Sequence, residues 1–134
     1  MRNIVITYLT VLVVFTAIDF LWLGFVALDF YKRELGPLML DKPRLEIAAL
    51  FYALIAAGIT ILAVQPALNA GEWHKAVLLG AVLGLCAYGT YDLTNLATLQ
   101  RWSLRLTVVD MAWGTFLTSI AALTGYLAGR ASGS

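Results

Sequence analysis

Four long apolar segments, separated by short polar connections, make up nearly the whole chain. They cover residues 4–28, 45–65, 75–98 and 104–127. A helix needs about 20 apolar residues to cross the hydrocarbon core of a bilayer. Proline interrupts helical hydrogen bonding, so Pro66 is expected to end the second helix. The pattern predicts an all-α polytopic integral membrane protein. Its four transmembrane helices form one bundle over residues 1–129, and residues 130–134 are expected to be a disordered tail or an expression scar.

Composition agrees with this pattern and excludes several kinds of protein. The 134 residues are 61% hydrophobic and 13% charged, whereas soluble domains are about 45–50% apolar and about 25% charged. A net charge of +1 gives no electrostatic footprint for nucleic acid, which is not expected as a partner. Cys86 has no second cysteine to pair with, and the single histidine, His74, lies at a span boundary. No metal site and no cofactor are predicted.

The distribution of basic residues predicts the orientation of the four spans. The first and third connections hold six basic residues, and the opposite side holds three, which are Arg2, Lys75 and Arg130. Basic residues are enriched in cytoplasmic loops. The first and third connections are therefore predicted to be cytoplasmic, with both termini outside.

Three carboxylates interrupt the apolar spans: Asp19, Asp92 and Asp110. A charge at the centre of a membrane helix costs roughly 2.5–3.5 kcal/mol on insertion scales. With a rise of about 1.5 Å per residue, all three fall at a similar depth, in the predicted cytoplasmic half. The second span is rich in alanine and is interpreted as a packing helix. The predicted proton- or substrate-binding site comprises Asp19, Asp92, Asp110, Asn95, Tyr88, Trp22, Trp113 and Thr107.

A faint internal repeat links the first and fourth spans. The segment Thr16-Ala-Ile-Asp19-Phe-Leu-Trp22 is matched by Thr107-Val-Val-Asp110-Met-Ala-Trp113, and a glycine follows each. The two helices run in opposite directions in a four-span topology. Any symmetry between them would therefore be of the inverted kind found in many transporters.

The carboxylates suit several functions. They can hold helices together by hydrogen bonds, or bind a proton or cation, with the aromatic rings supplying cation–π surface. The prediction favours proton- or cation-coupled binding or transport of a small solute. The alternative is a membrane-embedded lipid-modifying enzyme or a lipid- or isoprenoid-binding protein, and catalysis is left open. Expected partners are membrane lipids, the small solute or lipid ligand, and a second copy packed through Gly80 and Gly84, which form a small-xxx-small pair.

The string Thr90-Tyr-Asp-Leu-Thr-Asn-Leu-Ala-Thr-Leu99 occurs together with Asp19-x-x-Trp22-Leu-Gly24 and Val109-Asp110-Met-Ala-Trp113-Gly114-Thr115. This combination resembles an uncharacterised bacterial family of predicted membrane proteins, the domain of unknown function 2177. The resemblance covers essentially the whole chain. It implies four spans in a bacterial inner membrane, with periplasmic termini from the charge pattern above, and it implies no activity.

Overall fold

The computed structural model describes residues 4–40, 42 and 44–132, and every regular element in this part of the chain is a helix. The predicted all-α fold is confirmed. In chain order the elements are α1 (Ile4–Leu21), the π-helical segment η1 (Trp22–Val26), α2 (Leu28–Leu35), the short 3₁₀ helix η2 (Gly36–Leu38), α3 (Leu45–Ile59), the π-helical segment η3 (Thr60–Val64), α4 (Gln65–Ala70), α5 (Trp73–Thr98) and α6 (Leu104–Ala131).

Four continuous helical stretches are long and apolar enough to cross a membrane: Ile4–Val26, Leu45–Ala70, Trp73–Thr98 and Leu104–Ala131. Large apolar side chains remain exposed along these stretches, among them Val13, Leu54, Leu78 and Phe116. A soluble protein of this size rarely exposes so much contiguous apolar surface. The outer surface of the bundle is therefore suited to contact with lipid chains.

The second span does not end at Pro66, contrary to the sequence-based prediction. It continues through η3 and α4 to Ala70. Pro66 lies in the first turn of α4, where a residue does not need its backbone N–H to continue the helix. The π-helical η3 directly before it alters the hydrogen-bond register. The proline is thus accommodated without breaking the span.

The last span is also longer than predicted, because α6 reaches Ala131. Its final turn contains Arg130, and a cation near a helix C-terminus is favoured by the helix dipole. The start of the predicted tail is therefore helical. Residues 133–134 lie outside the described residues. So does Arg2, which was counted in the comparison of basic residues on the two sides of the membrane.

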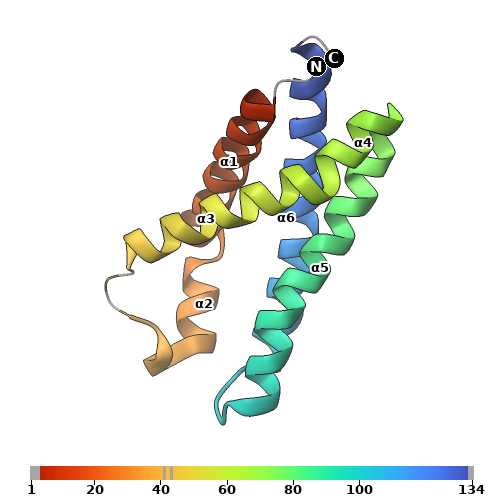
Figure 1. Ribbon diagram of the computed structural model, residues 1–134. Helices are drawn as coiled ribbons and strands as arrows, with labels where there is room; N and C mark the ends of the chain where they lie inside the picture. Colours follow the sequence, from red (N-terminus) through yellow and green to blue (C-terminus); the bar gives the residue numbers. More distant parts are fainter. Residues whose placement is uncertain (1–3, 41, 43, 133–134) are drawn as a thin grey trace.

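The helices are not arranged as four parallel rods (Figure 1). The N-terminal end of α1 and the C-terminal end of α6 lie at one end of the molecule, whereas α2 and the α5–α6 turn lie at the other. α5 and α6 pack side by side over much of their length, and α1 packs against α6. The second span runs obliquely across them, so the beginning of α3 leans away from the rest of the bundle.

Glycines bring α5 and α6 into close contact. A Cβ atom at Gly84 would lie 2.6 Å from the backbone oxygen of Gly114, and one at Gly80 would lie 2.9 Å from the Cβ atom of Ala122. These glycines therefore serve packing within one chain. A homodimer remains a prediction, and it would need a face other than the one formed by Gly80 and Gly84.

Replacing Gly114 by alanine is expected to destabilise the protein by about 1–3 kcal/mol, the usual effect of overpacking. A Cβ atom there would lie only 2.1 Å from Cγ of the Tyr88 ring. Gly58→Ala is the matched control, because nothing lies within 4 Å of a Cβ atom at that position. Reversible unfolding in mixed micelles should separate the two variants. Equal stability of both would contradict the observed packing.

Candidate functional site

The structure brings the three carboxylates of the spans together from three helices. Asp19 of α1 is 6% exposed, Asp92 of α5 is fully buried, and Asp110 of α6 is 9% exposed. Asp110 lies close enough to both of the others to interact with them electrostatically. The predicted convergence of these residues in depth and on facing sides of the helices is therefore present in the fold.

Asp19 is held by two donors from different spans. The Tyr52 hydroxyl of α3 donates to Oδ2 at 2.7 Å, and the Trp113 indole N–H of α6 donates to Oδ1 at 3.0 Å. The second span was interpreted as a packing helix without a polar contribution, and Tyr52 corrects that view. Tyr52, Ala56 and Ile59 form the buried face of α3. The signal available in the sequence was Tyr52 itself, a single residue with a hydroxyl group that lies at helical spacing from the alanines of this face.

Asp110 receives its hydrogen bond from a residue outside the spans. The Tyr31 hydroxyl of α2 donates to Oδ1 of Asp110 at 2.7 Å, and the same hydroxyl accepts the indole N–H of Trp22 at 3.2 Å. Burial raises the pKa of Tyr31, and the negative charge of Asp110 raises it further. The phenol therefore keeps its proton at neutral pH and remains available as a donor. Sequence reasoning missed Tyr31 because it lies within the most charged segment of the chain.

The turn after the first span places Tyr31 over the cluster. Beyond α1 the chain passes through η1, and Ala27 leaves helical geometry with φ −114° and ψ 7°. Ala27 and Tyr31 then pack against Leu106 of α6, with Trp102 beside them. Glu34 accepts a hydrogen bond from Ser103, the N-cap of α6. α2 is thereby fixed against the start of the fourth span.

The two repeat tryptophans stack at the centre of the cluster. The rings of Trp22 and Trp113 are 4.2 Å apart between centroids and nearly parallel, at 8°. Each tryptophan serves the aspartate of the other repeat: Trp113 donates directly to Asp19, and Trp22 reaches Asp110 through Tyr31. Because α1 and α6 run in opposite directions, the two motifs meet as an inverted pair.

Asp92 differs from the other two aspartates because none of the described donors bonds to it. Neither of its carboxyl oxygens accepts a hydrogen bond from a residue in the described part of the chain. Its polar neighbour is the carboxyl group of Asp110, which is close enough for a hydrogen bond if one of the two groups carries a proton.

The remaining predicted site residues are less directly connected to the carboxylates. Tyr88 packs its ring onto Gly114 at the α5–α6 contact. Thr107 is buried, but its hydroxyl donates to the backbone oxygen of Ser103 at 2.9 Å and so bonds within its own helix end. Asn95 is half-buried near the C-terminus of α5, one turn beyond Asp92.

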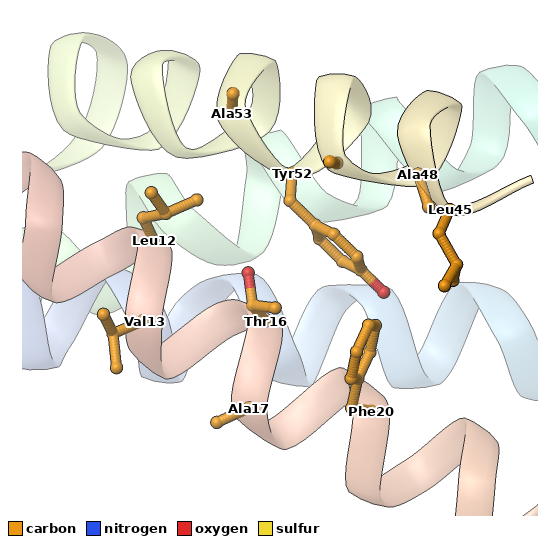
Figure 2. A pocket seen from close by; sticks show the side chains of 10 residues that line it. Leu12, Val13, Thr16, Ala17, Phe20, Leu45, Ala48, Tyr52 and Ala53 are labelled. Carbon is orange, nitrogen blue, oxygen red and sulfur yellow. The ribbon is translucent and has the colours of Figure 1, made fainter.

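An apolar groove of about 660 Å³ lies between α1 and α3 (Figure 2), and its lining includes Tyr52, the donor to Asp19. It lies where the two helices diverge, and its exposed lining residues, such as Val13 and Leu45, open it to the outside of the bundle. Tyr52 and Thr16 bring hydroxyl groups to this mostly apolar wall, and the Thr16 hydroxyl has no partner among the described residues. The lining consists of Leu12, Val13, Thr16, Ala17, Phe20, Leu45, Ala48, Ala49, Tyr52 and Ala53.

No cation of the described chain neutralises the cluster. The ion pair found among the described residues joins His74 to Glu72 at 2.9 Å, at the exposed start of α5. The described part of the chain contains no group of three or more histidine, cysteine, aspartate or glutamate side chains arranged to hold a metal ion. The carboxylates therefore depend on hydrogen bonds, on protons or on a bound cation.

The family model described as "Predicted membrane protein", the domain of unknown function 2177, matches residues 4–127. The chain belongs to this family. The match includes the first three spans, most of the fourth and every residue of the cluster, so the predicted resemblance is confirmed. No curated protein and no solved structure matches the chain. Family membership supports a place in a membrane and assigns no activity, so the function must be argued from the cluster and the groove.

Replacing Trp22 by phenylalanine is expected to abolish the exciton couplet that two stacked indoles produce in circular dichroism. The couplet requires both Trp22 and Trp113. Trp73→Phe is the control, because Trp73 is exposed and pairs only with His74 among the described aromatic rings. A couplet that persists in Trp22→Phe, or that disappears in Trp73→Phe, would show that the indoles are not stacked as described.

Proposed function

We propose that this membrane protein binds, and carries, an amphiphilic cation whose apolar chain lies in the groove between α1 and α3 and whose charged head contacts Asp19. The observation that carries the proposal is the position of Tyr52. Its side chain lines the groove, and its hydroxyl donates to the Asp19 carboxylate. An apolar compartment thus ends at a buried acceptor.

The size and chemistry of the groove favour a ligand with an alkyl chain. Pockets for small ligands commonly measure about 300–1,000 Å³, are mostly apolar and contain a few placed polar groups. The groove falls within this range, and it opens where lipid chains surround the bundle. A ligand could therefore enter sideways from the bilayer, without a water-filled path. This favours an amphiphile over the small solute expected from sequence.

The charge of the site favours a cationic head. Three carboxylates lie together, and no lysine, arginine or histidine of the described chain pairs with them. A cationic head at Asp19 would displace the Tyr52 hydroxyl from Oδ2 and pair with the carboxylate through its charge. Trp113, already bonded to the same carboxylate, offers an aromatic ring close to the head, and ring faces attract cations.

Asp19→Asn is expected to weaken binding of dodecyltrimethylammonium about 10- to 100-fold, since the attraction between two opposite charges about 4 Å apart is about 1 kcal/mol in water and about 4 kcal/mol near a protein surface. Asparagine keeps an acceptor for Trp113, so the fold should persist. Binding is measured by native mass spectrometry and by titration in phosphatidylcholine nanodiscs, with empty nanodiscs subtracted. Dodecanol, which has the same chain without the charge, should bind wild type no more tightly than it binds Asp19→Asn.

A second pair of variants tests the groove itself. Ala49→Phe places a ring in the groove, and Ala112→Phe makes the same change at an exposed position of α6 away from it. The first should reduce dodecyltrimethylammonium binding at least tenfold, and the second should not. Equal affinities in wild type, Asp19→Asn and Ala49→Phe would overturn the proposal.

A further inference from the structure

The Asp92–Asp110 pair is a second polar centre, separate from the Asp19 carboxylate that the groove residue Tyr52 contacts. We propose that this pair is a one-proton site, with the proton on Asp92 and the charge on Asp110, and that a cation bound at Asp19 releases the proton. The proposal deepens the function proposed above and rests on it for the release step, but not for the existence of the proton site.

The direction of the hydrogen bonds makes Asp110 an acceptor, which suits it to hold the negative charge of the pair. An indole N–H can only donate, so the Tyr31 hydroxyl accepts from Trp22 and must direct its own proton elsewhere. That proton points to Oδ1 of Asp110, at 2.7 Å. Asp110 is therefore an acceptor at this oxygen, and its other oxygen is available for a second donor.

Asp92 has only one way to become a hydrogen-bonding partner. It is fully buried and receives no bond from the described donors, and the group facing it is the Asp110 carboxyl. Two adjacent carboxylates cannot both be ionised without strong repulsion, as in pairs that share one proton. A proton on Asp92 removes the repulsion and supplies a donor to Asp110. When this proton leaves, the O–H bond of Asp92 breaks, its hydrogen bond to Asp110 is lost, and the proton passes to bulk water; no other covalent bond changes.

The surroundings supply no competing proton carrier at close range. α5 packs against α6, η3 and α4. From α6 the titratable group facing Asp92 is Asp110, and η3 and α4 carry no titratable side chain. On α5 itself the titratable neighbours are Tyr91, which interacts with both aspartates of the pair, and Tyr88, which interacts with Asp110 and Asp19. Tyr31 of α2 and Asp19 of α1 act on the pair through Asp110.

The link to the groove is electrostatic. Asp19 and Asp110 lie close enough for their charges to interact. The two stacked indoles belong to their two sets of hydrogen bonds: Trp113 donates to Asp19, and Trp22 donates to Tyr31, the donor to Asp110. A positive charge at Asp19 makes a further negative charge at the pair less costly, so the proton leaves as the cation binds. Linkage requires the converse as well: removing the proton must tighten cation binding, by up to about tenfold per pH unit for one exchanged proton.

Infrared difference spectroscopy on the protein in phosphatidylcholine nanodiscs tests the proton site without any ligand. Wild type at neutral pH should show the carbonyl band of a protonated, buried carboxylic acid, and Asp92→Asn should lack it. The asparagine amide can donate to Asp110 as the acid does, so this variant should fold and keep the tryptophan couplet. Asp29→Asn, at an exposed carboxylate of α2, should retain the band. Tyr31→Phe should shift it, because Asp110 loses its other donor.

Titration with dodecyltrimethylammonium in weak buffer tests the release. Wild type should release close to one proton per cation bound and bind more tightly as pH rises. Asp92→Asn should release none, and its affinity should no longer rise with pH. Absence of the band in wild type, or a band that survives in Asp92→Asn, would overturn the proton site. Cation binding without proton release would overturn the coupling, whereas a band without any cation binding would overturn the proposed function alone.

Discussion

The burial of negative charge between α1 and α6 is the constraint on which the rest of the structure depends. An aspartate at mid-membrane costs roughly 2.5–3.5 kcal/mol, and a hydrogen bond to a charged group returns about 1.5–3 kcal/mol. Asp19 accepts two such bonds, from Tyr52 and Trp113, which offset part of the cost of its burial. Because those donors come from α3 and α6, offsetting the cost of one residue fixes three spans relative to one another.

The same requirement explains features that otherwise look unrelated. Asp110 has no donor from a spanning helix among the described bonds, and it obtains one from Tyr31 of α2. For Tyr31 to reach it, the chain must turn back after the first span, which it does through η1 and Ala27. The close approach of α5 and α6 through Gly84 and Gly114 brings Asp92 against Asp110. The glycines and the turn thus determine which carboxylates meet.

Sequence alone predicted the fold class, the number of spans and the aspartates that converge, because each depends on local and periodic signals. Apolar length identifies a span, and Asp19, Asp92 and Asp110 stand out because a charge in such a span is rare. The bends were not predictable in the same way. Pro66 looks like a helix end in sequence, and only the π-helical segment before it shows how the helix continues.

The donors were missed for a related reason. Tyr31 belongs to a charged connection by composition, and its place over the cluster depends on the path of the turn. Tyr52 is one aromatic residue in an apolar span, and its role depends on the oblique angle of α3. Thr107 shows the opposite case: its sequence position in the repeat suggested a site residue, whereas its hydroxyl bonds to its own backbone. Residue type and spacing identify which groups are costly to bury. The tertiary path decides which groups compensate for them.

The aspartates in the two halves of the inverted repeat have different hydrogen-bond partners, and this difference gives them different roles. Asp19 has direct donors, and one of them, Tyr52, lines a groove open to the outside of the bundle, whereas Asp110 is reached through Tyr31 and faces a second carboxyl group. A hydroxyl such as that of Tyr52 can be displaced by a cation that arrives along the groove. A buried carboxyl pair has no such access and can respond only by gaining or losing a proton. The Asp19 motif is therefore suited to exchanging a ligand with the bilayer. The Asp110 motif is suited to a change of charge when that exchange occurs.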